Sequence, residues 1–536
     1  MDEDTRIEAF TGPDLLGCRH RMARILRGDP APPAAPPDPA RRPPAPHWPA
    51  GATRIDPGPD ADLATLEAIA AGAPLILDAV LPMPGDAGVP ERARVEALVR
   101  WAGPHGYLPV RVTGHAVLAP RRGGGTAAAR VLDLAALAAP EPARRVAERP
   151  ALRVRERRAD AVALGQAAAA LDALGAGCGL VGVLGAERSA LAVAAAAPRI
   201  GAYRRARGAV AEVAAGLAAG VVPPPRRVRQ CRGCRWRAAC EARLRAADDI
   251  SLVLPGDRAD RLRARGIGTV RALAGAEGAG EAAWLARAAV AGIPAVRRVP
   301  VTAAPRAAVE VDVDVEAYPG AGPYLWGAWT AGGYRPFVSW AAPGARGAEE
   351  ALGAAFARFW AWLSGLRRQA AASGRSFAAY CWAAEAENRW LRQSAAAFGG
   401  RRFDGPDGPV TAPTRAEVDA LLGSAQWVDL FRVTRTQLLA PGGLGLKQVA
   451  PWAGFRWRDP EAGGEGSLAF YRVAAGIAPG DAAAARATLL RYNADDCRSM
   501  AVIRDWLGGE ASRVLPHGAD LPAPVSAGAA AGRPAG

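Results

Sequence analysis

The sequence contains a single lysine, Lys447, although lysine and arginine together number 67 residues. Arginine supplies every other basic side chain, in a chain that also holds 62 glycines and 46 prolines. This composition is typical of GC-rich coding, so the abundance of arginine does not by itself identify a partner. The net charge of +15 nevertheless favours a polyanion, and we expect the chain to bind nucleic acid.

The sequence also lacks an uninterrupted run of about 18 apolar residues, so no segment is expected to span a membrane. The first ten residues, MDEDTRIEAF, are acidic and lack the apolar core of a signal peptide. We therefore expect a cytoplasmic protein. In that reducing compartment, the seven cysteines are expected to be thiols or metal ligands rather than disulfides.

The length of 536 residues exceeds what one hydrophobic core sustains, and the patterning predicts a multi-domain α/β protein. Residues 1–245 alternate helical and strand-like stretches, interrupted at 27–52 by a proline-rich insert that is expected to be flexible. Residues 246–300 are mostly helical. Residues 301–512 begin with strands and continue into long helices, and 513–536 are expected to form a disordered tail.

Three cysteines, Cys231, Cys234 and Cys240, lie within ten residues of one another. Thiols at this spacing can converge on one metal centre, and the arginines between them would offset the charge of thiolates. Cys18, which also lies beside basic residues, is the best candidate for a fourth ligand. An iron–sulfur cluster, a structural zinc ion and unligated thiols remain the three alternatives. The other cysteines lie in apolar or helical contexts: Cys178, Cys381 and Cys497.

The segment VEVDVDVEAY predicts a strand with carboxylates on one face and valines on the other. Strict alternation places Asp312, Asp314 and Glu316 on the same side. Clustered acids repel one another unless a cation neutralises them, so the pattern indicates a metal site. Far downstream, Tyr492 and Asp496 stand four residues apart on a predicted helix and share one face. A solvated helix face is the alternative for that pair.

A further acidic ligand is expected between these two segments. Glu385 and Glu387 lie on a predicted helix, and Asp429 lies within VDLFRV, which has the pattern of a buried strand. A cap at the end of that strand is the alternative role for Asp429. Lys447 is a candidate catalytic residue, because a compact ammonium beside a scissile phosphate would explain why arginine was not used there; chance is the alternative.

The cysteine pattern, with one remote N-terminal Cys followed by C-x2-C and a further Cys, resembles that of the iron–sulfur RecB-like nucleases. The closest resemblance is to the RecB-like putative nuclease family, and it covers nearly the whole chain. It implies a PD-(D/E)XK-type domain at 1–245, whose [4Fe-4S] cluster pins the two ends of the domain together. The implied cluster ligands are Cys18, Cys231, Cys234 and Cys240.

The same resemblance implies an RNase H-like 3′–5′ exonuclease domain at 301–512, of the tyrosine-bearing DEDD class. Its acids hold two Mg²⁺ or Mn²⁺ ions, and its tyrosine orients the attacking water. The implied metal ligands are Asp314, Glu316 and Asp496, with Glu387 and Asp429 as further acidic positions and Tyr492 as the tyrosine.

The first domain departs from the family pattern at its nuclease centre. Glu96 stands at the first acidic position, but Arg111 and Thr113 replace the acid and the lysine expected on the next strand. Gln166 matches the trailing glutamine, whereas Ala170 replaces a tyrosine. Because arginine cannot bind a metal cation, we expect this domain to have lost catalysis and to grip DNA instead.

Within 246–300, the segment RLRARGIGTVRALAG resembles a helix-hairpin-helix, with a turn at 266–268 and a second helix from about Thr269. Such a turn presents backbone N–H groups to a phosphate. A helix pair that serves only packing is the alternative. The resemblance therefore implies that residues 246–300 form a DNA-binding linker.

Together these features predict a metal-dependent 3′–5′ exonuclease acting on DNA ends or single strands, with a helicase or another repair protein as a partner that the sequence does not identify. The alternative is a non-catalytic iron–sulfur DNA-binding scaffold in a repair complex. An RNA-directed enzyme would share the same acids.

Overall fold

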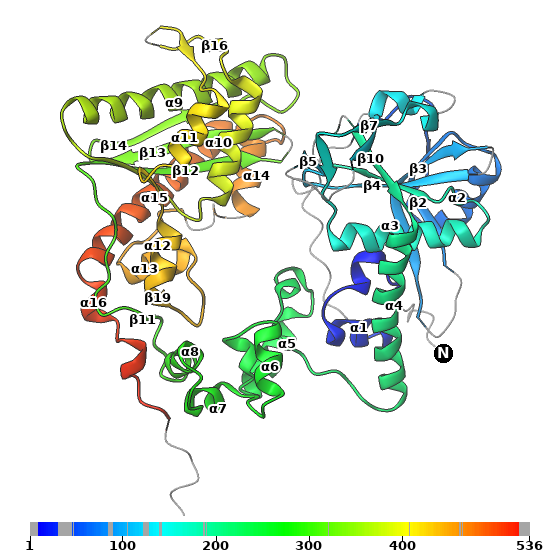
Figure 1. Cartoon of the computed structure of the whole chain (residues 1–536), viewed down its shortest axis with the longest axis horizontal. Helices are drawn as coiled ribbons and strands as arrows, with labels where there is room; N and C mark the ends of the chain where they lie inside the picture. The colour runs from blue at the N-terminus through cyan, green and yellow to red at the C-terminus, as the bar shows by residue number, and fades with distance from the viewer. Residues whose placement is uncertain are drawn as a thin grey trace, which may run out of the picture. The chain divides into compact units, whose positions relative to one another are not determined.

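The computed structural model describes residues 9–30, 46, 48–83, 89–103, 106–121, 128–138, 142–185, 188, 190–319, 321–406, 408–459, 463 and 465–524. The chain divides into two compact units, Met1–Ala247 and Asp248–Gly536 (Figure 1). Most of the proline-rich insert, residues 31–45 and 47, lies outside the described residues. No helix in the described part of the chain is both long and apolar enough to cross a membrane.

The first unit is built around an eight-stranded mixed sheet in the order β1-β2-β3-β4-β9-β10-β6-β7. Strands β2, β3 and β4 form an antiparallel meander, and the chain then returns through α3 so that β9 pairs in parallel with β4. These strands are β1 (Thr53–Arg54), β2 (Leu75–Pro82), β3 (Arg92–Ala102), β4 (Gly106–Val112), β6 (Ala129–Asp133), β7 (Ala147–Arg149), β9 (Leu180–Leu184) and β10 (Ala190–Ala195), beside the pair β5 (Leu118–Pro120) and β8 (Leu152–Val154).

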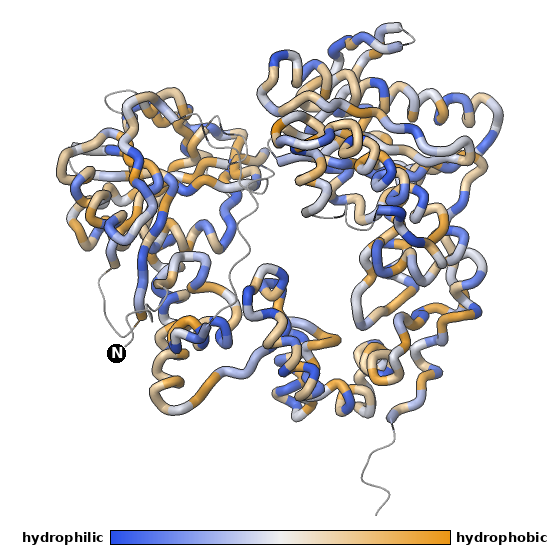
Figure 2. The backbone as a smooth tube through the Cα atoms, turned by 180° about the vertical axis from the view of Figure 1, so that it is seen from behind, coloured by the Kyte–Doolittle hydropathy of each residue, from blue (hydrophilic) through white to orange (hydrophobic). Residues whose placement is uncertain are grey.

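The apolar run in β2 reads almost without interruption because both faces of this strand are covered. Ile76 and Val80 pack against α2 and α3, whereas Leu75 and Leu77 pack on the opposite face. Figure 2 shows hydrophobic stretches along the strands of this sheet. The helices of the unit are α1 (Arg19–Leu26), α2 (Ala61–Ala70), α3 (Arg158–Ala173), α4 (Ala197–Ala218) and α5 (Arg237–Ala246), with 3-10 turns η1 (Gly12–Leu15), η3 (Leu134–Ala138), η4 (Pro142–Arg145) and η5 (Arg229–Gly233).

The second unit contains a five-stranded sheet in the order β14-β13-β12-β15-β18. Strands β12, β13 and β14 form an antiparallel meander. Strand β15 then pairs in parallel with β12, and β18 pairs in parallel with β15. This is an RNase H-like arrangement with β12 at the centre. The strands are β12 (Val309–Tyr318), β13 (Gly322–Thr330), β14 (Gly333–Val338), β15 (Phe377–Cys381) and β18 (Trp427–Asp429).

Helices cover both faces of this sheet (Figure 1). The valine face of β12 packs under α9, where Val311 and Val313 share a core with Phe356 and Phe359. The acidic face of β12 lies under α15. The helices are α9 (Ala348–Ala372), α10 (Glu385–Phe398), α11 (Arg415–Leu422), α12 (Leu430–Gln437), α13 (Leu446–Trp452), α14 (Glu465–Ala474) and α15 (Ala482–Gly508). The pair β16 (Arg402–Phe403) and β17 (Val410–Thr411) is separate from the sheet.

The predicted strand VDLFRV is wrong beyond its first two residues. Strand β18 ends at Asp429, and α12 begins at Leu430. The Asp429 side chain accepts the backbone N–H of Arg432 at 3.0 Å and so caps this helix. The apolar pattern of a short helix that is half-buried cannot be told from that of a strand.

Most of the predicted linker, residues 248–300, belongs to the second compact unit. It carries η6 (Ile250–Leu252), α6 (Asp257–Arg263), α7 (Val270–Gly275), α8 (Glu281–Val290) and β11 (Val296–Arg297), and β11 pairs with β19 (Leu438–Leu439). The predicted helix, turn and second helix are present. The N–H groups of Val270 and Arg271 already donate to Asp248, so a phosphate would have to bind through other N–H groups of the turn.

The prediction of a disordered tail from residue 513 is wrong for residues 513–524. Helix α16 (Ala511–Val514) and the turn η8 (Gly518–Asp520) continue the fold, and Leu521 is buried. The Arg287 guanidinium donates to the carbonyl of Leu521 at 3.0 Å. A few apolar side chains that dock on α8 suffice to order a segment rich in alanine and proline. Residues 525–536 lie outside the described residues.

Candidate functional site

Three carboxylates from β12 and α15 meet at one point of the second unit. Asp314, Glu316 and Asp496 each offer one oxygen, and these oxygens lie within 4.8 Å of one another. Alternation along β12 brings the first two to one face, and α15 brings the third across that face. Carboxylates this close repel one another unless protons or a cation neutralise them, so the trio is a candidate cation site.

Burial raises the pKa of all three carboxyls, and repulsion within the trio adds to this rise for Asp314 and Glu316. Burial is the largest cause for Asp314, whose pKa lies well above its ordinary value, and the charges of Asp496, Glu316 and Glu387 add to it. Burial and Asp496 raise the pKa of Glu316 to about 8. Burial also raises the pKa of Asp496, to about 6, against a hydrogen bond from Trp457 that lowers it. Without a cation, the trio therefore retains protons near neutral pH.

These shifts predict how pH and metal ions affect stability. The folded protein binds more protons at these carboxyls than the unfolded chain does, so metal-free stability is expected to fall as pH rises from about 4 through about 8. A divalent ion replaces those protons, and it binds best when they are gone. Mn²⁺ is therefore expected to raise the melting temperature more at pH 8 than at pH 5.5. An equal shift at both pH values in a thermal melt would contradict this expectation.

Two neighbouring side chains hold the acids in place. The Asn493 amide donates to Asp314 Oδ2 at 2.7 Å and accepts the hydroxyl of Tyr334 at 2.7 Å. The indole of Trp457 donates to Asp496 Oδ1 at 2.7 Å. Position 327 must be glycine for α15 to approach this closely, because a Cβ on Gly327 would lie 1.6 Å from Asn493 Oδ1. Sequence reasoning assigned no role to these orienting residues.

Tyr492 and Lys447 lie beside the trio. Burial, followed by the charge of Asp496, raises the pKa of Tyr492 above its ordinary value, so the phenol keeps its proton and hydrogen-bonds with Asp496. The Lys447 ammonium lies 4.6 Å from the centre of the Tyr492 ring and 5.8 Å from that of Trp457. It lowers the pKa of Glu316 and of Asp496, which shows that its charge faces the carboxylates.

Of the three candidates for a further acid, Glu387 has the most distinctive environment. It is buried, and its Oε2 has no hydrogen-bond partner among the described residues. Burial raises the pKa of Glu387 to about 7, and Asp429 adds to the shift. The charge of Glu387 in turn raises the pKa of Asp314, so the two carboxylates repel each other. Glu385 is exposed at the start of α10, and Asp429 caps α12.

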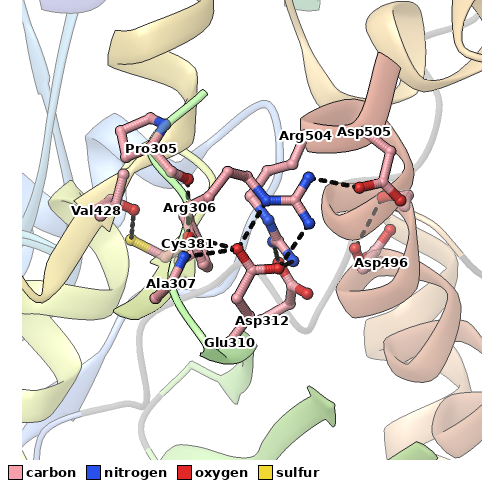
Figure 3. A network of polar contacts seen from close by, with 12 residues as sticks. Pro305, Arg306, Ala307, Glu310, Asp312, Cys381, Val428, Asp496, Arg504 and Asp505 are labelled. Carbon is pink, nitrogen blue, oxygen red and sulfur yellow. Dashed lines mark hydrogen bonds and ion pairs between the residues drawn. The ribbon is translucent and has the colours of Figure 1, made fainter. Parts of the chain in front are cut away.

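Asp312 shares the face of Asp314 but takes no part in the trio. Its carboxylate pairs with the guanidinium of Arg504 on α15, and both side chains are almost fully buried. Arg504 also pairs with Glu310 at 3.3 Å and lies 3.9 Å from the centre of the Tyr380 ring. Figure 3 shows this network, in which Arg306 also pairs with Glu310. The ion pair therefore joins α15 to β12.

In the first unit, the place of the expected nuclease centre holds an arginine between acids. Glu96 on β3 accepts the guanidinium of Arg111 at 3.0 Å and the N–H of Val112 at 2.9 Å. Arg111 also lies 3.9 Å from Asp160, whose other oxygen is 2.8 Å from His115. The hydrogen bonds of the Gln166 amide nitrogen go to Phe10 and Glu91 rather than to Glu96 or Arg111.

The Gln166 side chain instead joins α3 to the segments around Phe10 and Glu91. Its amide nitrogen lies 3.0 Å from Glu91 and 3.3 Å from the carbonyl of Phe10. The residue is fully buried. Its position supports a packing role within α3.

The four cysteines singled out by sequence line one pocket. They lie just before α1, within η5, directly after η5 and within α5, in this order: Cys18, Cys231, Cys234 and Cys240. Burial raises the pKa of the Cys240 thiol, and the neighbouring Cys234 and Cys18 raise it further, which places these sulfurs close together. The pocket thus joins segments more than 200 residues apart in the sequence.

Four thiols that line one pocket are a donor set that can hold a metal centre. Four cysteine sulfurs bind a tetrahedral zinc ion, with Zn–S bonds of about 2.3 Å, and four also bind an iron–sulfur cluster. The pocket therefore fits both of the metal centres expected from the sequence.

A family model described as the RNase_H superfamily matches residues 366–508. The match includes Glu387, Asp429, Lys447 and Asp496 but begins after β12, so it excludes Asp314 and Glu316. The match supports an RNase H-like domain, and the fold joins β12 to it. No curated protein and no solved structure matches the chain.

Proposed function

We propose that the second unit is a metal-dependent nuclease that releases nucleotides from the 3′ ends of DNA. The observation that carries this proposal is the meeting of three carboxylates from β12 and α15 within 4.8 Å. The RNase H superfamily match supports a nuclease activity. Bound Mg²⁺ or Mn²⁺ would supply an activated water and neutralise the charge that develops on the leaving oxygen.

Two sets of carboxylates would hold these ions. Asp314, Glu316 and Asp496 would form one set, because their oxygens are already grouped. Asp314 and Glu387 would form the other, because Glu387 presents a buried oxygen without a partner and its charge reaches Asp314. Asp429 would support Glu387 from the end of β18 while it caps α12.

The protonated Tyr492 would orient the attacking water rather than deprotonate it. Its raised pKa keeps the hydroxyl a hydrogen-bond donor at physiological pH. Lys447, on the same side, would contact the scissile phosphate. The two side chains lie close enough for the ring to hold the ammonium by a cation–π contact.

Labelled oligonucleotides test the substrate and the direction of cutting. Single- and double-stranded DNA and RNA, each labelled at the 5′ or the 3′ end, would be incubated with Mg²⁺ or Mn²⁺. A 3′–5′ exonuclease shortens 5′-labelled DNA through a ladder and releases labelled mononucleotide at once from 3′-labelled DNA. Binding without degradation in either metal would instead leave a DNA-binding scaffold as the function, and degradation of RNA alone would change the substrate class.

Replacing Lys447 by Met is expected to lower kcat/KM by about 10–100-fold, the loss expected for a hydrogen bond between charged groups. The same change should strengthen Mn²⁺ binding, because it removes a positive charge that faces Glu316 and Asp496. Steady-state kinetics over a Mn²⁺ titration measures both effects. Arg415→Met, on the exposed surface of α11, is the control. Unchanged kinetics and unchanged Mn²⁺ dependence in the Lys447 variant would remove this residue from the site.

We further propose that the first unit is a RecB-like domain that binds nucleic acid without cutting it. Two observations support this assignment. Glu96 and Arg111 lie on the neighbouring strands β3 and β4, where the family pattern places its acids. The Arg111 guanidinium lies between Glu96 and Asp160, so a permanent organic cation stands where a metal ion would bind.

The cysteine pocket is proposed to hold a [4Fe-4S] cluster that ties η5 and α5 to the start of α1. Anaerobically purified protein is then expected to be brown and to contain about four iron and four sulfide ions per chain. Cys231→Ser should lose most of the iron, whereas Cys178→Ser, outside the pocket, should keep it. Elemental analysis and the visible absorption spectrum give the result. A colourless protein with stoichiometric zinc would replace the cluster by a zinc ion.

A further inference from the structure

A histidine lines the cysteine pocket together with the four thiols. His20 is the second residue of α1 and lies two positions after Cys18. Its side chain is buried, with 3% of the residue exposed. Because Cys18 is the N-cap of α1, His20 is its second residue and both line the pocket, the imidazole and the Cys18 thiol can serve the same centre.

The hydrogen bond that His20 makes decides which of its ring nitrogens carries a lone pair. Nδ1 lies 2.7 Å from the carbonyl oxygen of Pro223, and a carbonyl can only accept. Nδ1 therefore carries the proton, and in the neutral ring Nε2 is left with a lone pair. Nε2 is buried and has no hydrogen-bond partner among the described residues.

A buried lone pair without a partner calls for a donor or a metal ion, because burial has removed its water. The remainder of the arrangement matches that of metal-binding histidines. Such a histidine nearly always donates its other ring N–H to a carboxylate or a backbone carbonyl, as His20 does to Pro223. Imidazole and thiolate ligands occur together on both zinc and iron–sulfur centres.

We propose that His20 is a ligand of the metal centre in the cysteine pocket and binds it through Nε2. This inference rests on the proposed presence of a metal centre at the four cysteines. The pocket then offers five donors, four sulfurs and one nitrogen, where four would suffice. His20 and Cys18 would accordingly replace each other in part at the end of the centre nearest to α1.

Pulsed electron paramagnetic resonance on the 536-residue chain tests the nitrogen ligand. The protein is grown with ¹⁵N-labelled histidine, purified anaerobically and reduced with dithionite. A directly coupled histidine nitrogen is expected in the wild type and should be absent from His20→Asn. The Asn amide can still donate to Pro223, so this variant keeps the local fold while it lacks Nε2. His115→Asn, whose imidazole pairs with Asp160, is the matched control and should keep the coupling.

If the isolated metal is zinc, X-ray absorption at the zinc edge replaces the resonance experiment, and one nitrogen ligand should disappear in His20→Asn. Metal content gives an independent measurement. Cys18→Ala should retain metal, and the Cys18→Ala, His20→Asn double variant should bind it at least about tenfold more weakly than the single variant.

The outcomes separate this inference from the one on which it rests. A wild-type protein that holds iron or zinc without nitrogen coupling, and whose His20→Asn variant keeps the same spectrum, would overturn the role of His20 and leave the four-cysteine centre intact. A wild-type protein that holds no metal after anaerobic purification and reconstitution would overturn both.

Discussion

Asp314→Asn is expected to reduce metal-dependent DNA degradation more than about 100-fold, because loss of a residue that merely orients a metal ligand already costs about 10–100-fold. Asp314 is the carboxylate that both proposed ions would share. The amide cannot supply the charge that balances a divalent cation. DNA binding should be unaffected, since the substitution removes no basic side chain. Degradation of end-labelled DNA and the fluorescence anisotropy of a labelled strand measure the two properties.

Thermal melting with and without Mn²⁺ shows whether the Asp314→Asn variant has lost metal binding or has lost its fold. Burial and the neighbouring acids raise the pKa of Asp314 well above its ordinary value, so the metal-free side chain is protonated and neutral near neutral pH, and a neutral amide of the same shape adds no repulsion. The variant should therefore melt no lower than the wild type without metal, and Mn²⁺ should no longer raise its melting temperature. Asp419→Asn, an exposed acid on α11, is the control. Wild-type activity in the Asp314 variant would refute the assignment of the active site.

Arg504→Met is expected to destabilise the second unit by about 3–5 kcal/mol, the usual cost of removing one partner from a buried ion pair. The guanidinium and the Asp312 carboxylate are only 3% and 2% exposed. Without Arg504, Asp312 would be left charged in the core or would have to take up a proton. Glu310 would suffer less, because Arg306 also pairs with it at 2.8 Å. Hydrogen exchange of the β12 and α15 amides reports this local stability directly.

Two further variants test whether the loss arises from the unpaired charge. The double variant Asp312→Leu, Arg504→Met should recover most of the stability, because apolar pairs often replace buried ion pairs at little cost. Arg306→Met should cost less than about 1 kcal/mol, since half of the Arg306 side chain is exposed to solvent. Equal protection of the amides in Arg504→Met and in the wild type would show that the ion pair contributes nothing to the docking of α15.

The same ion pair explains why one face of β12 performs two tasks. Asp312 and Asp314 are neighbours on that face, but only Asp314 joins the candidate cation site. Arg504 neutralises Asp312 and, by joining α15 to β12, helps to hold Asp496 opposite Asp314. The Arg504→Met substitution should therefore weaken Mn²⁺ binding as well, although Arg504 is not a proposed metal ligand.

Much of the candidate site could be predicted from the sequence because it depends on short-range periodicity. Alternation along VEVDVDVEAY placed the acids on one face, and a spacing of four residues placed Tyr492 beside Asp496. The spacing of Cys231, Cys234 and Cys240 likewise indicated a shared pocket. In each case, the geometry of a single strand, helix or turn determines which side chains lie together.

Other features of the site depend on contacts between segments that are far apart in the sequence, and these contacts could not be predicted. Nothing in the strand pattern separates Asp312 from Asp314; the arrival of Arg504 from α15 does so. Trp457 and Asn493 became orienting residues only when the chain brought them to Asp496 and Asp314. A spacing of three residues between Asn493 and Asp496 was the one available signal for the asparagine.

The sequence by itself determined which residues can bind cations, because carboxylates and thiols keep that chemistry in any fold and their local spacing sets their common face. Only the tertiary structure decided which of them remain available. A carboxylate that pairs with a guanidinium, as Asp312 and Glu96 do, is neutralised within the protein, whereas Asp314, Glu316 and Asp496 meet one another. Electrostatic energy falls with distance, so the identity of the nearest opposite charge after folding assigns each acid its role.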